Sequence, residues 1–245
     1  MGYTIDSMNK ITFANDGIYH LYNRGVEKRD IFLDEKDYLR FILNLYEFND
    51  SAPALNFGYQ LNRDSIEVRL QYERKQPLIE ILAFCLMPNH YHLMIRQKIE
   101  NGITIFTRKL GTGYTNYFNL KYTRVGSLFQ GKFKAVLLER EAHFLHLPHY
   151  IHLNPLDLQK VDWRNGRTES DREETLKFLK NYRWSSLSDY LGISNFPTIT
   201  ERAFLSECIG APNNFLQNMR EWLENIDFEY IHDKVIEEPP ETILK

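Results

Sequence analysis

The chain has 245 residues, of which 43% are hydrophobic and 14% aromatic, so it can bury a sizeable core and is not a disordered protein. Its formal net charge is −3, and its two cysteines, Cys85 and Cys208, form neither a disulfide framework nor a Cys-x-x-Cys zinc site. No apolar stretch has the length of a membrane span and the N-terminus lacks a signal-peptide pattern, so we expect a soluble cytoplasmic protein with no membrane partner.

The first half of the chain alternates between strand and helix patterns. Residues 17–23 alternate apolar and polar side chains, which predicts a strand that ends at the turn Asn23-Arg24-Gly25. Asp34 is a suitable N-cap for an amphipathic helix that ends in the segment 49–53. Residues 51–76 fit either a hairpin or a loop excursion. The apolar run 78–87 predicts a buried strand, and alternation resumes over 90–95.

The second half continues in the same way. Residues 103–121 have helical spacing, with a soft joint predicted at Gly111 and Gly113. Residues 132–138 alternate like a strand, and residues 141–153 predict a helix that stops at Asn154-Pro155. No glycine-rich phosphate loop occurs. The order of elements predicts an α+β sandwich with helices on one face of a mainly antiparallel sheet.

Charge is unevenly distributed along the chain. Residues 201–245 contain ten acidic and four basic residues, a net charge of −6, whereas residues 107–140 carry +6. In the basic segment, tyrosines and phenylalanines lie between the cations, a pattern that suits contacts to a phosphate backbone and stacking on unpaired bases. A solvated amphipathic helix followed by a loop explains the same composition equally well.

Two histidines lie in the strand pattern at 90–95. His90 and His92 are two residues apart, so their side chains project from the same face of a strand and can chelate a divalent metal with a third ligand from elsewhere. By itself, such a pair is more often the ordinary polar face of an edge strand.

The helix predicted at 141–153 is the best source of further polar groups. His143, His146, Tyr150 and Asn154 recur at intervals of three and four residues, beside a separate apolar stripe. Tyr150 and Asn154 are one turn apart, a spacing that suits a nucleophile beside a metal ligand. Two alternatives stay open at this point: the polar face is merely solvated, or His143 and His146 bind a metal themselves.

Several blocks together carry a resemblance to a known family. They are residues 19–25 (YHLYNRG), 86–93 (LMPNHYHL), 126–134 (GSLFQGKFK), 150–155 (YIHLNP) and 184–186 (WSS). Over about residues 17–191, the chain resembles the HUH tyrosine transposases of the IS200/IS605 type, especially their REP-associated relatives. The resemblance implies a ferredoxin-like core, which we place in residues 1–160. Apolar residues at helical spacing and the acidic composition of the tail predict a helical extension in residues 161–245.

The resemblance also implies site residues. His90 and His92 would hold Mg²⁺ or Mn²⁺, Tyr150 would be the nucleophile, and Asn154 takes the place of a third metal ligand. A zinc ion satisfies the same ligand count. Tyr114 and Tyr117 are rival nucleophiles but match no catalytic block.

The implied activity is metal-dependent cleavage of single-stranded DNA and strand transfer through a 5′-phosphotyrosine, as in DNA transposition or REP-element mobilisation. The alternative is a non-catalytic protein on the same fold that binds or regulates a DNA hairpin. Relatives act as monomers and as homodimers, so both states are compatible with the sequence. We expect contacts to the DNA backbone from five cations: Arg24, Arg108, Lys109, Lys132 and Lys134.

Overall fold

The computed structural model describes residues 13–52, 76–159 and 172–225. In these residues a four-stranded sheet has the order β2-β3-β1-β4, and every neighbouring pair is antiparallel. Its strands are β1 (Ile18–Arg24), β2 (Ile79–Met87), β3 (His90–Gln97) and β4 (Lys134–Leu137). Among the described residues, the helix 35–47 lies between β1 and β2 and the helix 102–121 lies between β3 and β4. This connectivity is ferredoxin-like, and the predicted α+β class is confirmed.

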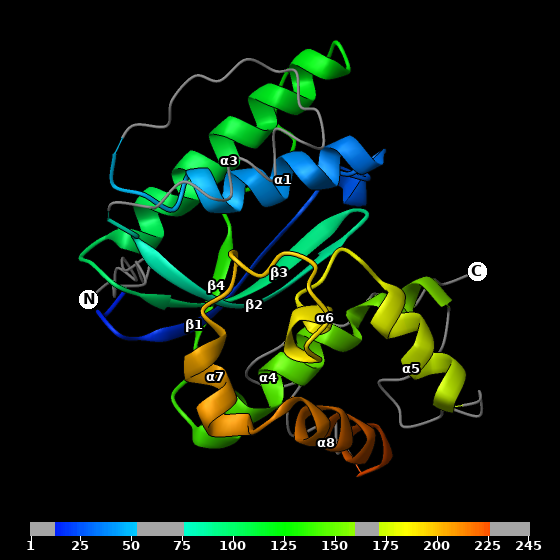
Figure 1. Cartoon of the computed structure of the whole chain (residues 1–245). Helices are drawn as coiled ribbons and strands as arrows, with labels where there is room; N and C mark the ends of the chain where they lie inside the picture. The colour runs from blue at the N-terminus through cyan, green and yellow to red at the C-terminus, as the bar shows by residue number, and fades with distance from the viewer. Residues whose placement is uncertain (1–12, 53–75, 160–171, 226–245) are drawn as a thin grey trace, which may run out of the picture.

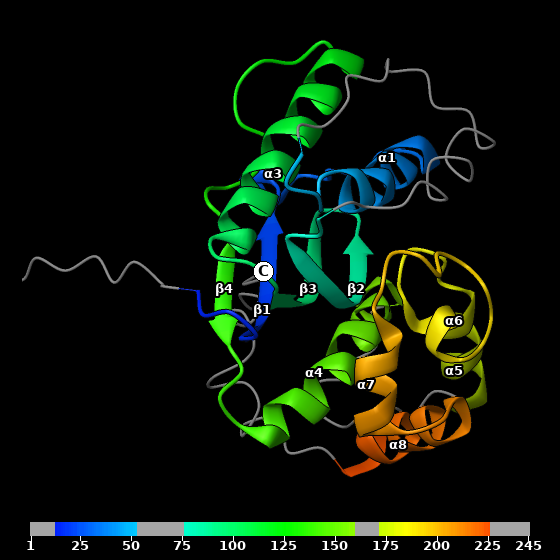
Figure 2. The ribbon, with the colours of Figure 1, turned by 60° about the vertical axis from the view of Figure 1, so that its left-hand side comes forward.

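Helices cover the sheet from both sides (Figures 1 and 2), so the prediction of helices on one face holds for the helices 35–47 and 102–121 but not for the helix 141–153. On one side lie α1 (Glu35–Glu47) and α3 (Gly102–Lys121), which are the two helices of the ferredoxin-like unit. On the other side lies α4 (Glu141–Leu153), followed by the short 3-10 helix Asn154–Gln159. The extension continues on that side with α5 (Arg172–Asn181), α6 (Leu187–Tyr190), α7 (Arg202–Ile209) and α8 (Pro212–Asn225).

The strands separate two hydrophobic cores because their side chains alternate between faces. On β3, Tyr91, Leu93 and Ile95 pack under α1 and α3, whereas Met94 packs in the core under α4. The pairing of β2 with β3 shifts between Ile81 and Ala83, a β-bulge. This shift brings both Leu82 and Ala83 into the α4 core.

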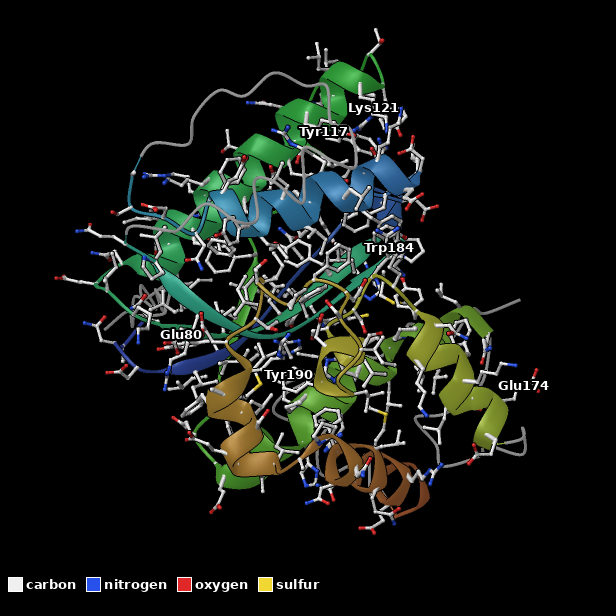
Figure 3. The ribbon with its side chains drawn as sticks, in the orientation of Figure 1. Glu80, Tyr117, Lys121, Glu174, Trp184 and Tyr190 are labelled. Atoms are coloured by element: carbon white, nitrogen blue, oxygen red, sulfur yellow. The ribbon has the colours of Figure 1, made fainter. Side chains whose placement is uncertain are left out.

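The N-terminus of α1 is fixed by the cap that the sequence predicts. Asp34 accepts a hydrogen bond from the Asp37 backbone N–H, and Asp37 completes a capping box. The buried carboxylate of Asp37 also accepts from the hydroxyls of Tyr117 and Tyr122 and from the Lys121 ammonium at 2.7 Å. This network ties the start of α1 to the end of α3, where Figure 3 labels Tyr117 and Lys121.

The soft joint predicted in α3 is wrong. The helix is continuous from Gly102 to Lys121. At Gly113, an added Cβ would lie 2.4 Å from the Phe48 ring, so this glycine allows the chain after α1 to pack closely on α3. At Gly111 an added Cβ would meet nothing within 4 Å.

The extension also covers the β2 edge of the sheet. The Leu86 N–H donates to the Trp184 carbonyl, the Ser186 N–H to the Phe84 carbonyl and the Glu201 N–H to the Ile81 carbonyl. Side chains of α5 to α8 join α4 and β2 in one core, so the extension packs on the ferredoxin-like unit. The predicted boundary at residue 160 and most of the ambiguous segment 51–76 lie outside the described residues. Among the described helices, none is long and apolar enough to cross a membrane.

Candidate active site

The antiparallel register places several polar side chains on the sheet face under α4. His92 lies opposite Tyr22 of β1, and His90 lies opposite Arg24. On the far side of β1, Tyr22 lies opposite Lys134 of β4. The two histidines of the motif therefore share a face with two of the predicted DNA-binding cations.

A third histidine lies within this group. His20 of β1 is fully buried, as is His92, and their rings stack with centroids 5.2 Å apart and planes 18° apart. The His20 Nε2 and the His92 Nδ1 are 3.0 Å apart, a hydrogen-bonding distance. The His90 ring stands edge-on to His92, with centroids 4.9 Å apart.

Sequence reasoning did not single out His20 as a site residue. The strand pattern at residues 19–25 does indicate its face, because His20 alternates with the core residues Tyr19 and Leu21 and so points to the opposite side of the sheet. What links it to His92 is the pairing of β1 with β3, a contact between residues 72 positions apart.

The predicted nucleophile is brought to the histidines by α4. The Tyr150 ring stands edge-on to His92, with centroids 5.7 Å apart, and edge-on to His20 at 6.1 Å. Tyr150 is 2% exposed, so its side chain is enclosed between α4 and the sheet.

Asn154 is buried at the end of α4, one turn after Tyr150. Its side-chain Nδ2 donates to the Tyr150 backbone carbonyl at 2.8 Å. The Oδ1 is the amide atom that a metal would use, because the amide nitrogen is a donor.

Histidine chemistry tests whether a metal fits here. The His90 Nδ1 lies 2.5 Å from the Asn89 Oδ1, which can only accept, so Nδ1 carries the ring proton and Nε2 is left as a metal donor. The His92 Nδ1 lies at hydrogen-bonding distance from His20, so Nε2 is the atom of this ring that a metal would use. The described residues contain no preformed group of three or more histidine, cysteine or acidic side chains for a metal. His90, His92 and Asn154 therefore stay the predicted ligand set.

The five predicted DNA-binding cations fall into two places. Arg24 and Lys134 lie on the histidine face, and Lys132 is exposed just before β4. The Arg24 Nε is buried without a hydrogen-bond partner among the described residues, and the Lys134 ammonium lies over the Tyr22 ring at 5.8 Å. Arg24 and Lys134 on this face, together with Lys132 two residues before Lys134, form a set of cations that we call the β1–β4 rim.

Arg108 and Lys109 are not part of this rim. Both lie on α3, on the opposite side of the sheet from the histidines. The Lys109 ammonium donates to the backbone carbonyls of Asp50 and Ala52, and partial burial lowers its pKa. Lys109 therefore stabilises the end of the α1 segment.

The rival tyrosines are also separated from the histidines. Tyr114 and Tyr117 belong to the core under α1 and α3. The Tyr114 hydroxyl donates to the Ile31 carbonyl, and the Tyr117 hydroxyl donates to Asp37. Burial raises the pKa of both phenols. Both hydroxyls lie in hydrogen bonds on the side of the sheet away from the histidines.

Among the described residues, the α4 histidines, His143 and His146 included, belong to no group of three or more metal-ligating His, Cys, Asp or Glu side chains. His149 contacts the Phe215 ring of α8 with centroids 4.9 Å apart, and the His152 Nε2 lies 2.8 Å from the Ser186 hydroxyl. Burial lowers the pKa of each of these two imidazoles to about 3, so both are neutral at ordinary pH. His149 and His152 therefore pack against the extension.

A family model matches part of this chain. A family model described as transposase IS200-like matches residues 62–154, a segment that contains His90, His92, Tyr150 and Asn154. The predicted resemblance to the IS200-like transposases is confirmed. A search of curated proteins found no match.

A solved structure is also similar to this chain. It is described as the structure of the REP-associated tyrosine transposase bound to a REP hairpin. It is 12% identical, with a TM-score of 0.45, and the match covers 79% of this chain and 90% of the solved one.

Proposed function

We propose that this protein cleaves and rejoins single-stranded DNA in a metal-dependent reaction, with Tyr150 as the nucleophile, as in transposition or the mobilisation of REP elements. The IS200-like match over residues 62–154 supports the transposase class. The observation that carries the catalytic proposal is the Tyr150 ring, which stands 5.7 Å from His92 although the two come from separate elements, α4 and β3.

The chemistry that follows is a pair of phosphoryl transfers. The Tyr150 phenolic oxygen attacks the phosphorus of the scissile phosphate, the bond to the 3′ oxygen breaks, and that oxygen leaves as a 3′-hydroxyl after taking up a proton. The DNA 5′ end is then held as a phosphotyrosine ester. A 3′-hydroxyl that attacks this ester releases Tyr150 and restores a phosphodiester, so no nucleotide cofactor is needed.

His90 and His92 are the residues that would hold Mg²⁺ or Mn²⁺ through their Nε2 atoms, with Asn154 Oδ1 as the third protein ligand. Bound there, the ion would supply Lewis-acid polarisation of the non-bridging phosphate oxygens. Imidazole suits Mn²⁺ at least as well as Mg²⁺, which prefers oxygen ligands.

The DNA strand is proposed to approach along the β1–β4 rim. Arg24 lies opposite His90 in the sheet, and its buried Nε is a donor that a phosphate oxygen can satisfy. Lys132 and Lys134 extend the same positive edge. Arg108, on the other side of the sheet, would contact a different part of a bound hairpin. The Lys109 ammonium is instead held by the Asp50 and Ala52 carbonyls.

The burial of Tyr150 adds a requirement. At 2% exposure, the phenol cannot meet a DNA phosphorus unless α4 shifts away from the sheet or the strand displaces neighbouring side chains. The same burial favours a second candidate function, a hairpin-binding protein on this fold that does not cleave.

The two functions are separated by one experiment. The purified protein is incubated with labelled single-stranded hairpin DNA from the flanks of its own gene, with Mn²⁺ or with EDTA, and run on a denaturing gel. We expect a covalent protein–DNA band with Mn²⁺ that is absent with EDTA and absent in Tyr150→Phe. Tyr117→Phe is the matched control, because it removes a phenol on the other side of the sheet.

Each result decides between the candidates. A covalent band that persists in Tyr150→Phe contradicts the assignment of the nucleophile. A shift on a native gel, without a covalent band under any metal, supports the binding protein instead.

A further inference from the structure

We propose that His20 is a positioning residue, which holds His92 in the ring tautomer and orientation that a metal ligand needs. This inference rests on the proposed metal site. It adds a residue from β1 that lies outside the His-x-His motif.

The contact itself is built by the sheet. His20 pairs with Met94, and His92 pairs with Tyr22, so the two histidines are diagonal neighbours on the same face. Diagonal side chains across an antiparallel pair are within reach of each other when they are long or aromatic. The rings of His20 and His92 do make this diagonal contact: they are stacked, and His20 Nε2 lies 3.0 Å from His92 Nδ1.

Both rings are fully buried, so the proton between them has a defined place. If His20 donates, His92 must accept at Nδ1, and its own proton lies on Nε2, which then cannot bind a metal. If His20 accepts, His92 carries its proton on Nδ1 and presents the Nε2 lone pair. Metal binding by His92 therefore selects the state in which His20 is the acceptor.

The surroundings of the pair favour a fixed geometry. The Tyr22 ring lies 5.0 Å from His20 and 6.0 Å from His92, and the Tyr150 ring stands edge-on to both. His90 has the equivalent acceptor in Asn89 Oδ1. Each metal-binding histidine thus has its own partner at Nδ1, and removal of such a partner commonly weakens metal binding about 10- to 100-fold.

The test measures metal binding by the full-length protein without DNA. Titration calorimetry with Mn²⁺ is carried out on the wild type, His20→Phe and His20→Gln. Phenylalanine keeps a ring of similar size but cannot accept a hydrogen bond, whereas glutamine supplies an acceptor oxygen. We expect a dissociation constant raised about 10- to 100-fold in His20→Phe and restored to within about 3-fold of the wild type in His20→Gln.

Two further variants control the titration. His90→Ala, which removes a proposed ligand, should abolish the binding. His152→Gln, which changes a buried histidine bonded to Ser186, should bind Mn²⁺ like the wild type. Equal affinity in His20→Phe and the wild type overturns the inference while the metal site stands.

A second readout does not depend on the metal or on cleavage. Nitrogen-15 chemical shifts of the His92 ring in the metal-free wild type should show the proton on Nδ1, and His20→Phe should lose this preference. A proton on Nε2 in the wild type overturns the inference whatever the DNA assays give. A wild type that binds Mn²⁺ with this tautomer but does not cleave DNA leaves the inference standing and removes the proposed catalysis.

Discussion

The two faces of the sheet bury different kinds of side chain for different purposes. Under α1 and α3, Tyr91, Leu93 and Ile95 pack among aromatic rings, and the buried Asp37 has its oxygens in hydrogen bonds. Under α4, the same strand presents His90 and His92. Burying imidazoles against one another is a poor way to gain stability, because polar groups lose solvation that apolar groups do not need. Both faces pack a hydrophobic core, but only the face under α4 buries the histidines of the proposed site.

The strongest test of this difference between the faces is to replace two neighbouring residues of β3 whose side chains lie on opposite faces of the sheet. Tyr91→Ala should lower the free energy of unfolding by about 3 to 5 kcal/mol, because it empties a buried site beside the Phe41 ring, 5.0 Å away between centroids. His90→Ala should change stability far less and reduce Mn²⁺-dependent cleavage at least about 100-fold. Urea unfolding and the denaturing gel measure the two effects. A comparable loss of stability in both variants contradicts the division between the faces.

On the α1 and α3 side of the sheet, replacing a buried acid of α1 should lower the free energy of unfolding more than replacing an exposed one. Asp37→Ala leaves the Tyr117 hydroxyl and the Lys121 ammonium without their buried acceptor and should cost about 3 kcal/mol. Glu35→Ala, in the same turn, removes an ion pair to Arg183 in which the Glu35 side chain is 61% exposed. Such a surface pair contributes about 0 to 1 kcal/mol. Urea unfolding of both variants tests the network, and equal costs would show that it does not stabilise the fold.

The α4 face should make stability depend on pH. Burial, with His146 as a smaller cause, lowers the pKa of His149 from 6.5 to about 3. Above pH 6.5 the imidazole is neutral in both states. As the pH falls below 6.5, His149 becomes protonated in the unfolded chain but stays neutral in the folded chain. The free energy of unfolding therefore decreases, by about 2 kcal/mol at pH 5.

The matching variant is His149→Gln, which cannot take up that proton. Its loss of unfolding free energy between pH 7.5 and pH 5 should be smaller than that of the wild type by about 2 kcal/mol. The midpoint of urea unfolding across this range measures the difference. Parallel pH profiles would contradict a neutral, buried His149.

Local patterns in the sequence predict much of this molecule. Alternation and the Asp34 cap predict β1, β2, β3 and α1 to within a few residues, because these signals depend on near neighbours. The spacing of His90 and His92 places both on one face for the same reason. Tyr150 is predicted as part of the site by resemblance, and the structure places it beside His92.

What the sequence does not predict depends on contacts between distant residues. The role of His20 requires the register of β1 against β3, and the position of Lys109 requires the packing of α3 on the segment after α1. Positive charge identified Arg24 and Lys109 equally, but Arg24 lies beside the histidines and Lys109 holds backbone carbonyls. Charge counts carry no information on which face of a sheet a side chain occupies.

Gly111 and Gly113 of α3 test whether local helix propensity or contacts with distant residues decide the effect of a substitution. The expected effects are the smallest of those predicted here. In an isolated helix, both Gly→Ala changes should stabilise by about 0.5 to 1 kcal/mol, since alanine loses less backbone entropy. Gly111→Ala should do so here, because its Cβ would meet nothing within 4 Å. Gly113→Ala should instead destabilise by about 1 to 2 kcal/mol, because its Cβ would lie 2.4 Å from the buried Phe48 ring. If the urea midpoint rises in Gly111→Ala and falls in Gly113→Ala, tertiary packing outweighs helix propensity at Gly113. If both changes raise the midpoint, Phe48 moves aside without cost.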